Sequence, residues 1–248
     1  NGAAISLVLS DPVTHQLGPV QNLLSGVDAV TVAVADFDHS GVSDFVLCNR
    51  ESFFSVFLAR GTTPFQLGQE VRIPTPQSCR AIHTADINRD GHPDVLVLSQ
   101  HAAQIWIYIG DGMGKLSLAE TVYLSALPNM FLSTDLSGDG RADLVVTHQS
   151  VWFGSLAVGI AGGGFRKPSS LPMMNVMSTL TSGDLDGDNK PELIFGSGSG
   201  FFDSDNCAVF QNRGSGDFAL ADVTLWGGSI AGLFVGDVDS DGRNDVLM

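Results

Sequence analysis

Short apolar runs alternate with acidic stretches along the whole chain. Runs such as VLVL from Val95 and LVV from Leu144 directly follow an acidic nonapeptide and are rich in β-branched residues. Runs of this length and composition predict buried β-strands rather than helices. The segments that precede the acidic stretches, such as TVAVA before Asp36, also have extended character. Each acidic stretch is therefore expected to be the loop of a β-hairpin.

The acidic nonapeptide returns five times at nearly fixed spacing, with first carboxylates 50, 49, 49 and 53 residues apart. The five copies are DFDHSGVSD from Asp36, DINRDGHPD from Asp86, DLSGDGRAD from Asp135, DLDGDNKPE from Asp184 and DVDSDGRND from Asp237. A period of about 50 residues predicts a repeat architecture rather than one core with a single site.

The segments between the acidic loops also keep register. A third strand is clearest in QIWIYIG from Gln104 to Gly110, and a Gly-rich turn and a fourth strand from Ser117 follow it. Four short antiparallel strands per repeat are the content of one β-propeller blade. The sequence therefore predicts an all-β propeller of four-stranded blades.

The spacing within each acidic loop favours calcium. Side chains at positions 1, 3 and 5 converge, position 9 returns a carboxylate, and position 7 offers a backbone carbonyl. Calcium takes about six to eight oxygens at roughly 2.3–2.6 Å, whereas zinc prefers Cys and His. An EF-hand is excluded because position 12 is never acidic, being Leu47, Val97, Val146, Phe195 and Met248.

Position 6 of the acidic loops is glycine in four copies and Asn189 in the fourth loop. These two residue types adopt a left-handed backbone conformation at least cost. The loop geometry is therefore specified as well as its charge.

These residues resemble the FG-GAP (VCBS-like) repeats of integrin alpha-subunit propellers. The likeness is clearest in SGDLDGDNKPELIFGSG and VGDVDSDGRNDVLM, and it covers essentially the whole chain. It implies a calcium loop in the first hairpin of each blade, so up to five Ca²⁺ ions, and a ligand that binds elsewhere. The implied ligands are Asp36, Asp38, Ser40, Val42 and Asp44; Asp86, Asn88, Asp90, His92 and Asp94; Asp135, Ser137, Asp139, Arg141 and Asp143; Asp184, Asp186, Asp188, Lys190 and Glu192; and Asp237, Asp239, Asp241, Arg243 and Asp245.

Four of these positions depart from the family pattern. Ser40, Asn88 and Ser137 are neutral where the pattern prefers aspartate, and Glu192 is one methylene longer. The first three loops therefore hold three acids each, and the last two hold four. Because affinity in such loops follows ligand charge, the last two loops are expected to bind most tightly.

The repeat positions divide one propeller region, 1–248, into full repeats at 23–70, 71–121, 122–170 and 171–222, with half repeats at 1–22 and 223–248. The half repeats either combine into one blade of a five-bladed ring or belong to a larger ring. Propellers of the resembled family are commonly seven-bladed, so we expect part of a seven-bladed ring. Self-association or the remainder of a longer chain would then complete it.

Net charge narrows the class of partner. The formal charge is −15, and the acidic loops contain 17 of the 27 acids, so bound calcium would offset most of it. No basic patch is available for phosphates, so nucleic acid is not an expected partner. No apolar stretch is long enough for a membrane span or a signal peptide.

The cysteines, tryptophans and histidines leave alternatives open. Cys48 and Cys79 are either buried thiols or an interblade disulfide. Trp106, Trp152 and Trp226 are expected in interblade cores, with sugar stacking as the alternative. No nucleophile and base stand at a recognisable catalytic spacing, so no enzymatic activity is expected.

The sequence thus predicts a secreted or cell-surface, calcium-stabilised propeller that acts as a recognition or adhesion module. Extracellular calcium modules bind at roughly 10⁻⁴–10⁻³ M, which only an extracellular setting saturates. The expected partner is a protein or glycan on a face away from the acidic loops. The alternatives are a lectin-type propeller, a structural subunit of an extracellular filament or matrix, and an accessory domain of a secreted hydrolase.

Overall fold

The computed structural model describes residues 4–8, 16–24, 29–62, 65–99, 101–173, 176–197, 205–226 and 230–248. Of the first half repeat, residues 1–3 and 9–15 lie outside this set. The regular elements of the described residues are all strands. No helix among them is long and apolar enough to cross a membrane.

Sixteen of the strands form four antiparallel sheets, each built from four strands that are consecutive in the chain. Blade I contains β3 (Ala29–Ala35), β4 (Asp44–Asn49), β5 (Phe53–Thr62) and β6 (Phe65–Pro74). Blade II contains β7 (Cys79–Ala85), β8 (Asp94–Ser99), β9 (Gln104–Gly110) and β10 (Leu116–Tyr123). Blade III contains β11 (Pro128–Thr134), β12 (Asp143–His148), β13 (Phe153–Ala157) and β14 (Ser169–Pro172). Blade IV contains β15 (Thr179–Gly183), β16 (Glu192–Gly196), β17 (Asp205–Asn212) and β18 (Phe218–Trp226).

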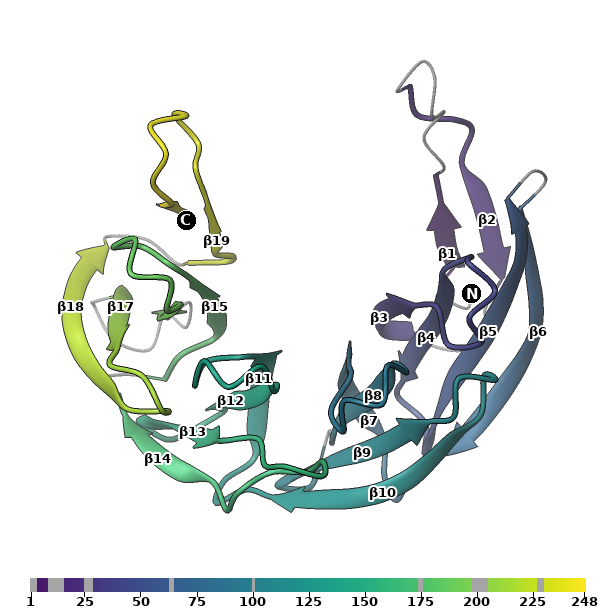
Figure 1. Ribbon diagram of the computed structural model, residues 1–248, viewed down its shortest axis with the longest axis horizontal. Coiled ribbons are helices and arrows are strands. Elements are labelled where there is room, and N and C mark those ends of the chain that lie inside the picture. Colours follow the sequence, from purple (N-terminus) through teal and green to yellow (C-terminus); the bar gives the residue numbers. More distant parts are fainter. Residues whose placement is uncertain are drawn as a thin grey trace.

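The blades stand around an open arc, with the first strand of each on the inner side and the fourth on the outer side (Figure 1). Two further sheets have two strands each and lie at the ends of the arc. They are β1 (Ala4–Leu7) with β2 (Gln21–Leu24), and β19 (Phe234–Gly236) with β20 (Asp245–Leu247). Among the described residues, the two hairpins form separate sheets and do not pair with each other. The all-β propeller architecture predicted from the sequence is confirmed.

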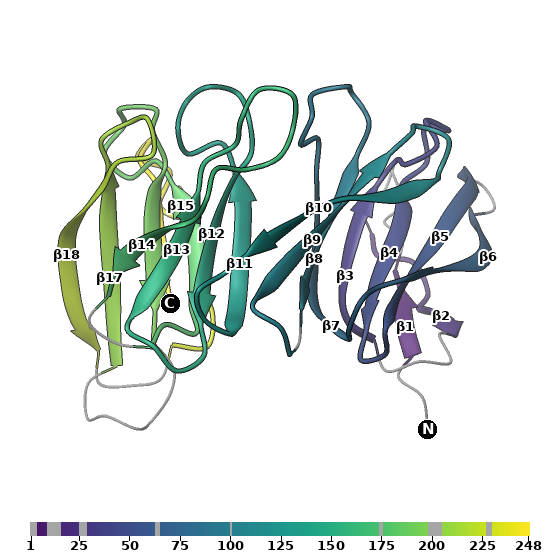
Figure 2. The same cartoon turned by 90° about the horizontal axis from the view of Figure 1, so that it is seen from below.

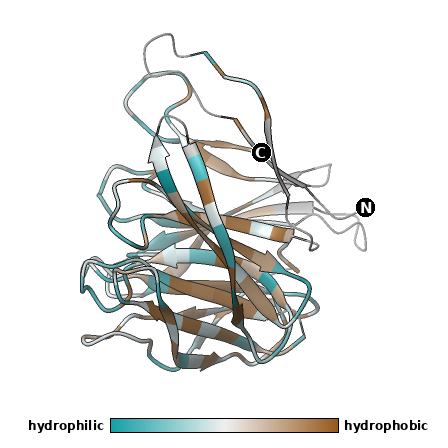
Figure 3. Cartoon of the chain, turned by 90° about the vertical axis from the view of Figure 1, so that its right-hand side faces the viewer, coloured by the Kyte–Doolittle hydropathy of each residue, from teal (hydrophilic) through white to brown (hydrophobic). Residues whose placement is uncertain are grey.

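The hydrophobic cores lie between blades rather than within one. On β8, Val95 and Val97 pack toward blade I, whereas Leu96 and Leu98 pack toward blade III. Successive side chains of a strand point to opposite faces, and both faces of this sheet are covered. All six residues of β8 are therefore buried, which explains the unbroken apolar run in the sequence. Figure 3 shows the same distribution, with hydrophobic strands and more hydrophilic loops.

Each acidic loop joins the first and second strands of its hairpin, as predicted. The closing pairs place the last residue of the first strand opposite position 9: Ala35 with Asp44, Ala85 with Asp94, Thr134 with Asp143, Gly183 with Glu192 and Gly236 with Asp245. The side view in Figure 2 shows the strands running between two edges of loops. The acidic loops therefore share one edge of the arc.

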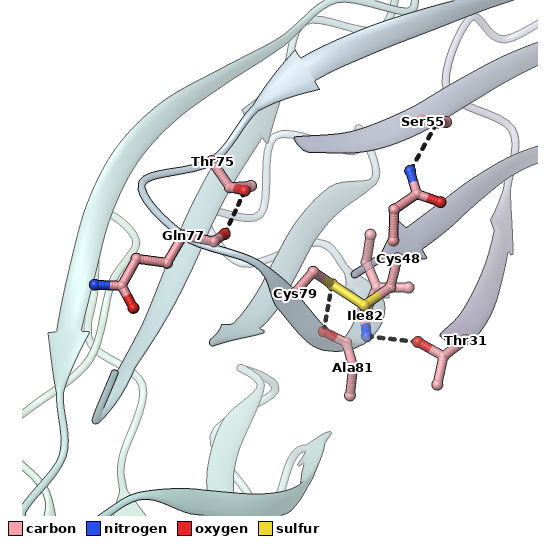
Figure 4. Close-up of a disulfide and its surroundings, with 9 residues drawn as sticks. Thr31, Cys48, Ser55, Thr75, Gln77, Cys79, Ala81 and Ile82 are labelled. Carbon is pink, nitrogen blue, oxygen red and sulfur yellow. Dashed lines mark hydrogen bonds between the residues drawn. A yellow bond between two sulfur atoms is a disulfide. The ribbon is translucent and has the colours of Figure 1, made fainter. Parts of the chain in front are cut away.

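A disulfide joins blades I and II. Cys48 on β4 and Cys79 on β7 are bonded, with a Cα–Cα distance of 5.5 Å, and both are fully buried (Figure 4). This resolves the alternative left open by the sequence in favour of an interblade bridge. Cys207 is a buried free thiol in the core between blade IV and the β19–β20 hairpin.

Candidate metal sites in the acidic loops

The acidic loops, numbered 1 to 5 in chain order (36–44, 86–94, 135–143, 184–192 and 237–245), share one backbone conformation. Positions 4 and 6 both have positive φ, as at His39 (54°) and Gly41 (79°) in loop 1. The sequence predicted this for position 6 only. Position 4 carries a side chain in three loops, at His39, Arg89 and Ser240, despite the cost of a left-handed conformation. Loops 3 and 4 have glycine at position 4, and this could have indicated the left-handed conformation from the sequence.

The position 1 carboxylate accepts hydrogen bonds from backbone amides of its own loop. In loop 1, Asp36 accepts hydrogen bonds from the amides of Ser40 (3.0 Å) and Gly41 (2.8 Å). Asp38 at position 3 accepts the Ser40 amide at 3.1 Å. A carboxylate at position 1 also accepts the position 6 amide in the other four loops, at Gly91, Gly140, Asn189 and Gly242. The amides thereby turn the chain around the acidic groups.

The position 9 carboxylate connects the loop to the third strand of the same blade. Asp44 is fully buried and accepts the amide of Phe37 at 2.8 Å and the amide of Ala59, on β5, at 2.7 Å. The same pair of bonds recurs in loops 2, 3 and 4: Asp94 with Ile87 and Gly110, Asp143 with Leu136 and Gly159, and Glu192 with Leu185 and Asn212. Gly159 lies just past the end of β13. Sequence reasoning missed this second role of position 9.

Burial and neighbouring charge act together on these carboxyl groups. Burial raises the pKa of Asp44 above its ordinary value, the amides of Ala59 and Phe37 oppose the rise, and the nearby Asp38 and Asp36 add to it. Burial likewise raises the pKa of Asp94. A cation beside such groups would relieve the repulsion among the carboxylates.

Three loops bring positions 1, 3 and 9 together, with ligand oxygens all within 4.8 Å of one another. The groups are Asp36, Asp38 and Asp44; Asp184, Asp186 and Glu192; and Asp237, Asp239 and Asp245. Loops 2 and 3 have Asn88 and Ser137 at position 3, so they bring fewer acids together. In loop 3 the Ser137 amide instead donates to Asp143 at 2.7 Å.

Position 5 does not belong to these groups of acids. Asp139 pairs with Arg141 at 2.8 Å, and Asp188 pairs with Lys190 at 2.6 Å, so both face the residue at position 7. The ion pair with Lys190 lowers the pKa of Asp188. Asp90 and Asp241 accept the position 7 amides of His92 and Arg243, and in loop 1 the Val42 amide donates to Ser40 Oγ.

Neighbouring acidic loops contact one another across the blades. His39 Nε2 lies 2.6 Å from His92 Nδ1, and Asn244 Nδ2 donates to the Asp184 carbonyl at 2.8 Å. The amide of Gly114, in the β9–β10 turn, donates to the carbonyl of Phe37 in the preceding blade. The conformation of one loop therefore influences the position of the next blade.

The donor set fits a hard cation. Carboxylate oxygens from two exposed or half-buried positions and one largely buried position converge in loops 1 and 4, and loop 5 presents the same three positions in an exposed setting. Calcium prefers oxygen ligands of this type, and no Cys joins the groups. Asp36, Asp38, Asp44, Asp184, Asp186, Glu192, Asp237, Asp239 and Asp245 are therefore the residues that would hold such an ion.

The tryptophans differ in burial. Trp106 is fully buried in the core between blades I and II, as predicted. Trp152 is 58% exposed at the edge opposite the acidic loops, which contradicts the expectation of core packing. It lies in the short β12–β13 connection, where no sheet covers it. The side chain of Trp226 lies outside the described residues.

Repeated four-stranded blades with an acidic loop in the first hairpin define a β-propeller built from sequence repeats. The FG-GAP-like repeat family matches residues 36–97, 90–146 and 184–248, which together are more than half of the chain. The chain therefore belongs to the FG-GAP-like repeat family. None of the curated protein sequences matches it significantly.

Solved structures with the same architecture share little sequence with the chain. BBS1N in a crystal structure with ARL6DN, soaked with lead, has a TM-score of 0.61 at 12% identity over 95% of this chain and 66% of that chain. The mercury-soaked form gives 0.60 at 14% identity, over 85% and 62%. An Agrocybe aegerita lectin that recognises non-reducing terminal N-acetylglucosamine gives 0.53 at 18% identity, over 77% and 50%. The chain thus spans between half and two thirds of these structures.

Proposed function

We propose that the chain is a calcium-stabilised propeller region of a secreted or cell-surface recognition module, without catalytic activity of its own. The family and the fold suggest a module for protein interaction or recognition. In this proposal the open arc is part of a seven-bladed ring, and each acidic loop binds one calcium ion. The loops hold the blades in place while a partner binds elsewhere.

The observation that carries the calcium role is the convergence of three carboxylates in loops 1, 4 and 5. Like charges at this range repel by roughly 1 kcal/mol or more per pair even when solvated. Each group is part of a loop that also contacts a neighbouring blade, as at His39 and Asn244. Calcium binding would therefore stabilise blade packing as well as the loop.

One observation and one general argument support an extracellular location. The buried Cys48–Cys79 disulfide is a bond that persists in oxidising compartments. Calcium affinities typical of extracellular modules are saturated only outside the cell. The proposal therefore assigns the folded, calcium-loaded form to the cell exterior.

The absence of a catalytic role rests on the accessibility of candidate groups. His148 Nε2 lies 2.8 Å from Ser155 Oγ, an arrangement that otherwise suits a base and a nucleophile. Both residues are buried, with exposed fractions of 0% and 2%. A substrate therefore has no access to this pair.

Thermal unfolding in excess EDTA and in 10 mM calcium tests the calcium role. A site with a dissociation constant near 10⁻⁴ M would stabilise the fold by about 2.7 kcal/mol at this concentration. We expect a higher Tm in calcium and little effect of magnesium, which prefers octahedral sites with retained water. Identical melting curves in EDTA and calcium would refute the calcium role.

Arrays of purified extracellular protein domains and of glycans test the recognition role. We expect the calcium-loaded chain to bind members of the protein array. Binding confined to the glycan array would support the second candidate, a lectin-type propeller. The exposed Trp152 and the fold shared with the Agrocybe aegerita lectin favour that candidate. Binding to neither array would refute recognition by this part of the chain.

A further inference from the structure

A cavity of about 510 Å³ opens at the edge of the arc opposite the acidic loops. It lies where the first strands of blades I, II and III begin, whereas the acidic loops follow the ends of these strands. Its lining comprises Val30, Thr31, Arg50, Ser78, Arg80, Ala81, His101, Asn129 and Met130. Three consecutive blades therefore contribute to one concave site, within the volume range of known ligand pockets.

The charge of this cavity is opposite to that of the protein. Among the described residues, Arg50, Arg80 and His101 line it and no acidic residue does, although the chain has 27 acids and only 12 lysines and arginines. The ion pairs among the described residues involve other cations: Arg72, Arg141 and Lys190. The two cavity arginines therefore meet no described carboxylate of their own chain.

The side chain of Arg80 is held in place by contacts across the blades. Arg80 donates from Nε to the carbonyl of Asn129 at 2.6 Å and from Nη2 to its side-chain oxygen. Arg50 and Arg80 also lie close in sequence to Cys48 and Cys79, so the interblade disulfide joins the two segments that carry them. Figure 4 shows this junction, where Thr31 accepts a hydrogen bond from the Ile82 amide at 3.1 Å.

We propose that this cavity binds the carboxylate of an acidic peptide segment on a protein partner. The proposal rests on the recognition function above and assigns its site. Guanidinium groups bind carboxylates through strong, charge-assisted hydrogen bonds. Arg50 is exposed and accessible for such a contact, while Arg80 extends the positive field between the blades.

The rim of the cavity favours a peptide over a sugar. Val30 and Met130 are 38% and 40% exposed, and they offer apolar contacts beside the positive charge. Methionine adapts its shape to varied protein surfaces. Among the described residues, no Phe, Tyr or Trp lines the cavity, so the large flat surface on which a sugar ring commonly stacks is missing there. An acidic side chain flanked by apolar residues matches this combination.

Fluorescence anisotropy with a defined probe tests the site. The probe is a fluorescein-labelled peptide of alternating glutamate and valine, compared with the same peptide carrying glutamine in place of glutamate. We expect the calcium-loaded chain to bind the glutamate peptide, with affinity that falls as salt is raised. Arg50→Gln should weaken binding about tenfold, the loss expected for one charge-assisted contact, and Arg50→Lys should restore part of it.

The matched control is Arg166→Gln, which removes the same charge from an exposed arginine beside the β13–β14 turn, outside the cavity. It should bind the peptide as the unchanged chain does, and melting curves of each variant verify folding. Equal affinity for the glutamate and glutamine peptides, or no effect of Arg50→Gln, would overturn the proposal. Arg50-dependent binding of an oligogalacturonate without binding of the peptide would overturn the peptide assignment.

The protein array separates this proposal from the broader function. If Arg50→Gln retains every array partner at unchanged strength, recognition stands and the cavity assignment fails. If the unchanged chain binds no member of the protein array, recognition of a protein partner itself fails. If Arg50→Gln loses the partners that the unchanged chain binds, while Arg166→Gln retains them, both are supported.

Discussion

The buried carboxylate of Asp44 lies 2.7 Å from the amide of Ala59, so an acidic loop and the third strand of its blade are joined by one side chain. The second oxygen of Asp44 accepts the amide of Phe37. Position 9 thus serves the fold through hydrogen bonds as well as being a candidate metal ligand. The hydrogen bonds stabilise the fold with or without calcium, whereas metal binding contributes only when calcium is present. Measurements in calcium and in EDTA can therefore separate the two roles.

Replacing Asp44 should destabilise the chain with or without calcium. Asp44→Ala leaves two buried amides without acceptors, a loss of roughly 2–4 kcal/mol. Asp38→Ala, at position 3 of the same loop, should lower the Tm in calcium but change it little in EDTA. Thermal unfolding of both variants in each buffer measures the difference. A Tm of Asp44→Ala equal to that of the unchanged chain in EDTA would contradict the hydrogen-bonding role.

Loops 4 and 5 should bind calcium before the others because they carry four acids each. Asp186→Asn in loop 4 should therefore abolish a tight binding phase, whereas Asp38→Asn in loop 1 should affect a weaker one. Calcium titration calorimetry resolves the two phases. An equal or greater loss of affinity in Asp38→Asn would reverse the ranking.

Removing the disulfide should weaken the junction of blades I and II. The bridge closes a segment with a sequence separation of 31 residues, worth about 3–4 kcal/mol in the chain-entropy description. The double variant with Cys48→Ala and Cys79→Ala should melt at a lower temperature than Cys207→Ala, which removes a buried free thiol. Calorimetry compares the variants. Equal melting temperatures would show that packing alone holds this junction.

Acid should destabilise the fold through His148. Burial lowers the pKa of His148 below its ordinary value near 6.5, although backbone groups of Leu127 and Ala126 oppose the shift. The unfolded chain therefore takes up the proton first, and this contribution to stability is lost progressively as the pH falls from about 6.5 toward the lowered pKa of the folded state. Melting curves between pH 7.5 and pH 5 should show a shallower decline for His148→Gln than for the unchanged chain. A slope for His148→Gln equal to that of the unchanged chain would contradict this contribution.

The repeat architecture was predictable because the same physical constraints recur in every blade. Strands such as Gln104–Gly110 and the acidic hairpins appear in the sequence as local patterns, and the structure contains them. The burial of Trp106 followed from its place in an alternating strand. Most of the fold could therefore be predicted from the local periodicity of the sequence.

Other features depend on contacts between residues that are distant in sequence. The bond from Ala59 to Asp44 and the cavity between Arg50 and Arg80 arise only when strands and blades meet. The Cys48–Cys79 pair was one of two alternatives because its geometry depends on the spacing of neighbouring blades. Trp152 was wrongly expected in a core, since its short connection does not extend the strand pattern.

Val95 and Val97 pack into the core on one face of blade II, and Leu96 and Leu98 pack into the core on its other face. The sheet of this blade therefore belongs to two hydrophobic cores. A destabilising substitution in one sheet therefore weakens the hydrophobic cores on both of its faces. Its effect reaches a distant blade only through the packing of every blade between them. Blades I and II also have a covalent bond across their shared interior. Among the described residues, the other blades meet through packing and hydrogen bonds alone, so covalent support is confined to the junction of blades I and II.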